Sequence, residues 1–416
     1  RFFGAHTYRR TCFVGDHTGR AIKAALVHQA EKMKLQFLEE IYITALTKHG
    51  DKPNGAVNSA VNGAIGFDMK SDDMALFNAK VVVLATGGHS RIYRRCSSRM
   101  MENTGDGIGL AFEAGAELQD MEMIQFHPTG MVWPRKMEGT LVTEAVRAEG
   151  GMLYNEKGER FMEKYDPVRM ELGPRDFVAR CIYREIAEGR GSKHAGVWLD
   201  IRHKEKEYIL ERLPSVYNQF LEHGIDMTQD LMEVAPTAHY SMGGIRVGLD
   251  GSTNVHGLYA VGEVTGGLHG ANRLGGNSLS ETMVFGKIVG EAAARAAKKS
   301  RLEEVSYREI LEKTKETRYF LGKPHTKNIG KLCSVLQETM WQYAGIVRSA
   351  KELHTALRNI EALKALMPYY QGKIKCIYID PPYNTGNEGW VYNDKVNSPK
   401  IKKWLGKVVG GEAADL

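Results

Sequence analysis

Short apolar runs that end in glycine mark two places in the chain. "KVVVLATGG" (residues 80–88) is a continuous hydrophobic run followed by a glycine pair, and "GLYAVGEVTGG" (residues 257–267) repeats the pattern. Such runs are typical of parallel strands that are buried on both faces and then turn tightly. Because a long segment separates the two, they predict one α/β unit that is interrupted in sequence by another.

The intervening residues 121–235 mix short strand-like and helix-like patterns and predict an inserted α+β domain. One stretch in it, "RDFVARCIYREIAEG" (residues 175–189), has helical spacing. Between about residues 300 and 366, apolar residues recur at helix spacing in "LEEVSYREILEKTKETRYFL" and "IGKLCSVLQETMWQYAGIV". We expect packing helices there.

Composition narrows the class of protein. The 416 residues exceed the roughly 250–300 at which single cores stop growing, so several domains are expected. With 43% hydrophobic and 25% charged residues, the composition is that of a globular protein, and no window approaches the apolar length of a membrane helix. The net charge of +6 is small and scattered, which does not indicate a nucleic-acid surface.

The cysteines and the first residue add two expectations. The five cysteines are far apart and form no C-x-x-C pair, which indicates a reducing, cytoplasmic setting and no metal site. The chain starts with Arg1 and not Met. We therefore expect it to begin inside a longer reading frame.

The glycine-rich "NTGDGIGLAFEAGA" (residues 103–116) has two interpretations. Glycines allow close approach of a backbone to a cofactor, and Asp106 could accept a hydrogen bond from a ribose hydroxyl. Alternatively, Asp106 caps an ordinary helix start. Taken alone, this motif decides nothing.

Two further motifs carry titratable groups. "QFHPTG" contains His127, and "LVTEAVRAEGG" contains Thr143, Glu144 and Arg147. On a helical turn, the spacing of three residues predicts that Glu144 and Arg147 come together. A surface ion pair and a buried proton relay both remain open.

Arginine and histidine also recur among glycines later in the chain. Arg175 lies in "LGPRD", His239 in "APTAHYSMGGI" and Arg273 in "LHGANRLGGNSLSE". Guanidinium groups bind carboxylates in a bidentate fork. The set predicts a clamp for a dicarboxylate, although each residue alone would suit a structural ion pair.

This ordered series, with "VGEVTGGLHGANRLGGNSL" and "VFGKIVGE", resembles the flavoprotein subunit of fumarate reductase and succinate dehydrogenase over about residues 1–360. The resemblance implies an FAD-dependent oxidoreductase that interconverts succinate and fumarate beneath a mobile capping domain. The partner that it implies is a separate iron–sulfur subunit. It also implies, through membrane anchor subunits, a peripheral place on the inner face of the cell membrane.

The resemblance assigns roles residue by residue. Arg175 matches the residue that exchanges a proton with the substrate carbon, and Glu144 and Arg147 match its proton supply. The residues that match the carboxylate-binding set are His127, Thr143, His239 and Arg273. The residues that match flavin contacts are Asp106, Glu263, Ser278 and Leu279, with the turn Thr86, Gly87 and Gly88.

L-aspartate oxidase shares most of these motifs and remains an alternative. That family usually has cysteine where this chain has Met242 and alanine where it has Thr237, which favours the fumarate and succinate enzymes. The G-x-G-x-x-G phosphate loop of a dinucleotide fold does not occur in the chain. We therefore expect an incomplete, Rossmann-like FAD domain in an N-terminally truncated chain.

The last residues resemble a different family. "IKCIYIDPPYNTGNEGWVYND" (residues 374–394) is similar to motif IV of adenine-N6 DNA methyltransferases, and the likeness extends over about residues 359–416. In such a motif the acid and a proline carbonyl hold the exocyclic amine while the tyrosine stacks on a flipped base. The matching residues are Asp380, Pro381, Pro382 and Tyr383.

So short a fragment buries too little to act alone. We therefore expect no nucleic-acid partner and interpret the chain as a join of two reading frames, with an inactive chimera as the alternative. The predicted division is an FAD-binding domain in two parts (1–120 and 236–299), an α+β capping domain (121–235), a helical segment (300–358) and a short α/β methyltransferase-like fragment (359–416).

Overall fold

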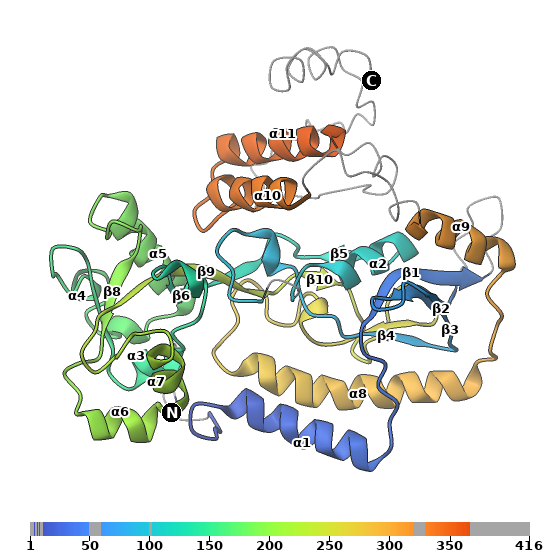
Figure 1. The fold of residues 1–416 in the computed structure, drawn as a ribbon, viewed down its shortest axis with the longest axis horizontal. Helices are drawn as coiled ribbons and strands as arrows, with labels where there is room; N and C mark the ends of the chain where they lie inside the picture. Colours follow the sequence, from blue (N-terminus) through green and yellow to red (C-terminus); the bar gives the residue numbers. More distant parts are fainter. Residues whose placement is uncertain are drawn as a thin grey trace.

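The computed structural model describes residues 4, 6, 8, 11–49, 60–99, 102–318 and 329–366, arranged as in Figure 1. The helices are α1 (Thr18–Lys32), α2 (Asp106–Ala114), α3 (Glu144–Ala148), α4 (Met162–Tyr165), α5 (Arg175–Ala187), α6 (Lys206–Arg212), α7 (Pro214–Leu221), α8 (Asn277–Lys299), α9 (Tyr307–Arg318), α10 (Ile329–Tyr343) and α11 (Ala350–Leu366). The strands are β1 (Ile41–His49), β2 (Ala60–Asp68), β3 (Met74–Asn78), β4 (Val82–Leu84), β5 (Leu118–Gln119), β6 (Ile124–Met131), β7 (Met152–Tyr154), β8 (Val197–Asp200), β9 (Met232–Ser241), β10 (Gly244–Ile245) and β11 (Leu258–Ala260).

The two predicted apolar strands are β4 and β11, which pair in parallel, Leu258 opposite Val82. The parallel pairing is confirmed, and so is the tight turn, because Gly87 has a φ of +77°. Burial on both faces is wrong for β4: Val83 is 41% exposed. Side chains alternate along a strand, and the face that carries Val83 is not covered by the residues that the structure describes.

The inserted segment folds around an antiparallel sheet in the order β6-β9-β8-β7. The predicted helix at residues 175–189 is confirmed as α5. Its buried residues Val178, Ala179, Cys181, Ile182 and Glu185 recur at intervals that match the helical period, so they form one face of the helix. That face enters a core with side chains of the sheet and of α7, including Leu199 and Phe220.

The helices expected between residues 300 and 366 are present as α9, α10 and α11 in the described ranges. Figure 1 shows α10 and α11 as a stacked pair on the side of the molecule opposite to α8. Their apolar residues join a cluster with Tyr93 of the first unit and Phe126 of β6. The helix α11 continues through residue 358 without a break, so residues 359–366 belong to this helical layer and not to a separate fragment.

Within the described ranges, no helix combines the length and the apolar character that crossing a bilayer requires. The tail motif with Asp380, Pro381, Pro382 and Tyr383 lies outside the described residues.

Candidate functional site

Two neighbouring strands supply the centre of the site. On β6, Gln125 and His127 are two residues apart and therefore lie on the same side of the strand. On β9, Thr237 pairs with His127 in the sheet register, and His239 follows two residues later. The rings of His127 and His239 lie 5.3 Å apart, edge to face. The sheet thus brings together two histidines that are more than a hundred residues apart in sequence.

Both histidines are held in the neutral form. Burial lowers the pKa of His127 well below its usual value, and the positive charge of Arg175 and the nearby His239 add to the effect. The pKa of His239 falls for the same reasons, burial first and then Arg175 and Arg273. The amide of Thr129 donates to Nδ1 of His127 at 3.2 Å. A neutral ring that accepts at Nδ1 carries its proton on Nε2, which makes this nitrogen a donor for a ligand.

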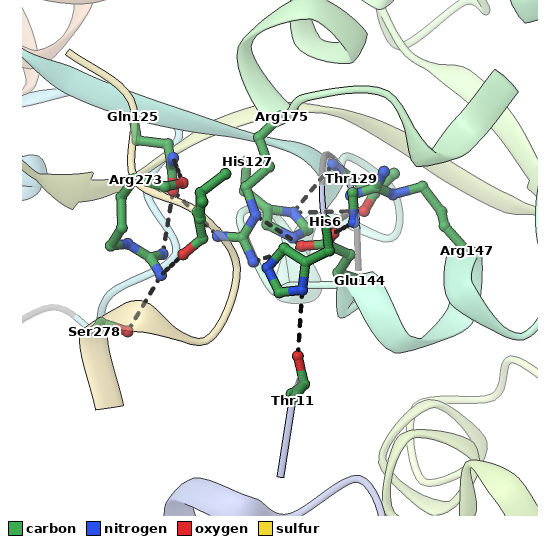
Figure 2. A network of polar contacts seen from close by, with 12 residues as sticks. His6, Thr11, Gln125, His127, Thr129, Glu144, Arg147, Arg175, Arg273 and Ser278 are labelled. Atoms are coloured by element: carbon green, nitrogen blue, oxygen red, sulfur yellow. Dashed lines mark hydrogen bonds and ion pairs between the residues drawn. The ribbon is translucent and has the colours of Figure 1, made fainter. Parts of the chain in front are cut away.

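Arg175 and Glu144 form a buried ion pair between two helix starts, as Figure 2 shows. Arg175, the first residue of α5, donates from Nε to Oε2 of Glu144, the first residue of α3, at 2.8 Å. The amide of Gly4 donates to the other carboxylate oxygen at 2.5 Å. Burial by itself would raise the pKa of Glu144, but Arg175, Arg147 and this amide outweigh it and lower the pKa. Glu144 is therefore an anion at neutral pH.

The predicted pairing of Glu144 with Arg147 is wrong as a direct ion pair. Arg147 is fully buried, and its Nη1 donates to the backbone oxygen of Glu171 at 2.5 Å. Both oxygens of Glu144 are already engaged by Arg175 and Gly4. Arg147 still lies near enough to lower the pKa of Glu144, so the relation is electrostatic and does not involve a bond.

Gln125 joins the two arginines of the predicted clamp. Its side-chain oxygen accepts from Arg175 Nη1 and from Arg273 Nη2, both at 3.1 Å, as Figure 2 shows. One acceptor thereby holds two cations that repel each other. Sequence reasoning missed this residue, because no strand is predicted for "QFHPTG"; on a strand, its place two positions before His127 puts both side chains on the same face.

A second layer positions Arg273. Its guanidinium carbon lies 4.3 Å from the ring centre of Tyr240, and the hydroxyl of Tyr240 donates to buried Glu281 at 2.6 Å. His269 contacts the same carboxylate oxygen at 2.8 Å. Burial and the charge of Arg175 lower the pKa of Arg273 to about 10, so it remains a cation at neutral pH. Sequence reasoning also missed this layer.

Several buried polar atoms on the residues predicted to form this site have no hydrogen-bond partner in the described part of the chain. They are Thr143 Oγ1, Thr237 Oγ1, Arg147 Nη2 and Arg273 Nε. Buried polar groups normally find partners, so this group of orphans indicates a polar ligand. A cavity of about 710 Å³ adjoins Thr143 and is also lined by residues at the start of α1 and in α7.

The expected cofactor residues gather at a different edge. Thr86, Gly87 and Gly88 follow β4, and Glu263 follows β11, so both groups lie at the carboxyl ends of parallel strands. This is where α/β sheets bind nucleotide cofactors. A Cβ added to Gly88 would clash with Ser241 and approach Oε1 of Glu263 to 2.8 Å.

Glu263 is half-buried, and its partial burial raises its pKa to about 7. Its Oε1 accepts from the amide of Ser241 at 3.0 Å. A carboxyl that is only partly ionised at neutral pH can both donate to and accept from a hydroxyl, which fits the ribityl or ribose hydroxyls of FAD. The residues present at this edge therefore fit that cofactor.

The other three expected contacts are placed less centrally. Asp106 is the first residue of α2, exposed, and its carboxylate accepts from Thr104 at 2.8 Å. It lies at the helix start but does not cap it, because the N-cap residue is Gly105 and no side chain makes a capping hydrogen bond there. Ser278 receives a hydrogen bond from Arg273 Nη1 at 3.3 Å. Leu279 lies next to Ser278 in the first turn of α8 and reaches Gly19 of α1.

The chain is similar in sequence to known proteins. The model of the FAD binding domain family matches residues 1–279. A subunit of the fumarate reductase (CoM/CoB) of Methanothermobacter marburgensis is 44% identical over 87% of this chain and 64% of that protein. L-aspartate oxidase of Acinetobacter baylyi is 40% identical over 88% of this chain and 66% of that protein.

Solved structures agree in fold. The E. coli quinol fumarate reductase has a TM-score of 0.80 at 31% identity and covers 88% of this chain and 63% of its own. Sdh1 of Mycobacterium smegmatis has a TM-score of 0.72 at 42% identity, covering 88% and 62%. The chain thus spans less than two thirds of the length of these solved structures. The residues matched by the family model include the sheet strands, the buried arginines and the Gly88 turn. The chain therefore belongs to the FAD binding domain family, whose cofactor is FAD.

Proposed function

We propose that the chain is the flavoprotein part of an oxidoreductase that interconverts succinate and fumarate. The observation that carries the proposal is the buried pair Arg175 and Arg273 on one oxygen of Gln125, beside two neutral histidines and unpartnered donors. Such a site has an excess of positive charge and needs an anion of about two charges. A four-carbon dicarboxylate carries one such charge at each end.

Each residue then has a distinct task. Arg273, the Nε2–H group of His127 and the imidazole of His239 bind the carboxylates and fix the orientation of the carbon skeleton. Thr143 and Thr237 supply hydroxyl donors from the sides. Burial strengthens these electrostatic interactions, because water does not screen them.

The proton step belongs to Arg175 and Glu144. A guanidinium is a poor acid in water, so it needs a dry site and a base that returns the proton. Oε2 of Glu144 lies 2.8 Å from Nε of Arg175 and is placed to do so, with Arg147 keeping Glu144 ionised. FAD, when bound, supplies the two-electron donor or acceptor for the substrate carbon.

Electron partners follow from the same proposal. The relatives include flavoprotein subunits of the fumarate reductase type. We propose that a separate iron–sulfur subunit exchanges electrons with the flavin and that any membrane contact is made by further subunits.

The test is a dicarboxylate titration of the FAD-reconstituted chain, following flavin absorbance, together with fumarate turnover by a reduced dye. Arg175→Gln is expected to retain binding and to lose turnover by about 10²- to 10⁴-fold, the usual contribution of a general acid. Arg273→Gln is expected to lose binding. The exposed Arg301→Gln should behave as the unmodified chain. A spectrum that fumarate, succinate and malonate leave unchanged would contradict the proposal.

L-aspartate oxidase is a second candidate, because several relatives carry that name at 36–40% identity. The hydroxyl of Thr237 lies buried beside His127 without a partner in the described part of the chain. Because the oxidase family usually has alanine at this position, Thr237 favours the enzyme that interconverts succinate and fumarate. Peroxide release from L-aspartate in air, with no turnover of fumarate by a reduced dye, would instead support the oxidase.

A further inference from the structure

A cavity of about 450 Å³ lies between the inserted domain and α10, and it shares no residue with the site described above. Its volume falls within the range of small-molecule sites. Four aromatic or imidazole rings line it, namely Trp133, Tyr183, His194 and Trp341. The cavity therefore combines a suitable size with flat surfaces.

The lining is strongly cationic. Arg94, Arg95, Arg135 and Lys193 face one acid, Glu138. That acid is already paired with Arg95 at 3.0 Å and with Arg94 at 3.8 Å. Within the described ranges, Arg135 and Lys193 form no ion pair. Two exposed cations are thus left over at the cavity, and they are available to an anion.

His194 is held in one orientation by a buried acid. Its Nδ1 lies 2.7 Å from Oε2 of Glu233, which is buried and also holds Ser192. Because Nδ1 is engaged, Nε2 is the ring nitrogen left for a ligand. A carboxylate behind a histidine is the arrangement that orients imidazoles in binding and catalytic sites.

Trp133 provides a surface for a planar group. Its indole lies flat on the imidazole of His194, at 4.3 Å and 6° between the planes. The stack occupies one face of the indole, and Trp133 is still 47% exposed. Exposed indole faces beside arginine and lysine are the combination by which proteins bind planar bases that carry phosphates.

We propose that this cavity binds a nucleoside di- or triphosphate. Arg135 and Lys193 hold the phosphates, Nε2 of His194 accepts a hydrogen bond from a hydroxyl or amino group of the nucleoside, and the base packs on the free face of Trp133. The inference concerns a second site and stands apart from the reaction at Arg175. It involves binding alone.

The test uses the purified chain saturated with FAD, so that ATP cannot occupy the flavin site. Calorimetry and tryptophan fluorescence are recorded as ATP is added. We expect saturable binding, about tenfold or more weaker in Arg135→Gln and Lys193→Gln, as for the loss of a charged hydrogen bond. Trp133→Ala should weaken ATP binding and reduce the fluorescence change, with Trp341 supplying what remains. Lys157→Gln, an exposed lysine of the same domain outside the cavity, should bind as the unmodified chain.

Retention of FAD by each variant shows that the variant is folded. Because Arg135 and Lys193 are exposed, replacing them with glutamine should not disturb the packing of the core. Pyrophosphate alone and adenosine alone should each bind more weakly than ATP. The proposal would be overturned if ATP showed no saturable binding at millimolar concentration. It would also be overturned if the Arg135 and Lys193 variants bound ATP as tightly as the unmodified chain does. A third contradicting result is that pyrophosphate binds as tightly as ATP and that Trp133→Ala has no effect.

Discussion

At the scale of single residues, burial decides the charge state of the groups in the site. His127 is 1% exposed and lies near His239 and several arginines. A proton on its ring would be both poorly solvated and repelled. At about pH 6.5 a histidine in water is half protonated, whereas this buried ring stays neutral. It can therefore donate from Nε2 without adding charge to a cationic site.

This charge state predicts how stability depends on pH. The folded pKa of His127 lies well below 6.5, so below that pH the unfolded chain binds a proton that the folded chain does not. The free energy of unfolding is therefore larger at higher pH. It decreases as the pH falls below 6.5, by about 1.4 kcal/mol per pH unit for one such group. Urea unfolding at pH 7.5, 6.5 and 5.5 should give a shallower loss for His127→Gln than for the unmodified chain. His28→Gln, an exposed residue of α1, should keep the original slope; equal slopes for all three would refute the argument.

A glycine pair offers a second test at this scale. A Cβ at Gly88 would meet Ser241 and Glu263, whereas a Cβ at Gly109 on α2 would have no atom within 4 Å. Gly88→Ala is expected to destabilise the fold by about 1–3 kcal/mol through overpacking and to weaken FAD binding, measured by flavin fluorescence. Gly109→Ala should be neutral or stabilise by up to about 1 kcal/mol, because alanine favours helix. Equal effects of the two changes would show that crowding at the turn does not matter.

At the scale of elements, a chain of amide and carboxylate contacts links α5 to the loop before α8. Asn272 donates to Asp176 at 2.5 Å and accepts from Gln125 at 2.9 Å. Through Gln125 the link reaches Arg175 and Arg273. The helix α5, the strand β6 and the loop before α8 thus share one polar network at the site.

The network predicts the effect of removing its middle member. Asn272→Ala deletes two side-chain hydrogen bonds, one of them to a carboxylate, so the arginines should be held less firmly. We expect the dissociation constant for fumarate to rise by about tenfold or more, with little change in unfolding temperature. The exposed Gln29→Ala of α1 is the matched control. Unchanged fumarate binding in Asn272→Ala would show that the two units are aligned by other contacts.

At the scale of the whole molecule, α10 and α11 cover a core to which distant segments contribute. Ile360 of α11 is buried with Phe126 of β6 and Ala238 of β9. The ring of Phe126 also contacts Tyr93 at 5.3 Å and Trp341 at 6.1 Å. The helical layer is therefore continuous with the strands that carry the site.

This continuity predicts a shared loss of stability. Ile360 is 2% exposed and Leu357, one turn earlier on α11, is 38% exposed. Ile360→Ala should destabilise the chain by about 2–5 kcal/mol through the cavity it leaves, with circular dichroism and flavin release shifting together in urea. Leu357→Ala should cost much less. If the helical circular dichroism signal is lost at a lower urea concentration while flavin release keeps its original midpoint, α11 unfolds separately.

Sequence reasoning recovered the cofactor, and the family match confirms FAD. It also recovered α5, the parallel pairing of β4 with β11 and the helices after residue 300. These depend on local patterns: apolar periodicity, glycine after a strand, and motif order. It did not find Gln125, Asn272 or the Tyr240–Glu281 support, because their importance lies in contacts between residues up to about 150 positions apart.

The sequence by itself determined which chemical groups the protein has and the class of ligand that they suit, since guanidinium, imidazole and carboxyl groups carry their chemistry with them. Only the tertiary structure decided their state and partners. Burial made His127 neutral and brought the pKa of Glu263 to about 7. It also paired Glu144 with Arg175 in place of Arg147. The physical reason is that pKa values and hydrogen-bond partners depend on the solvent and charges around a group, and these are set when β6, β9, α3 and α5 pack together.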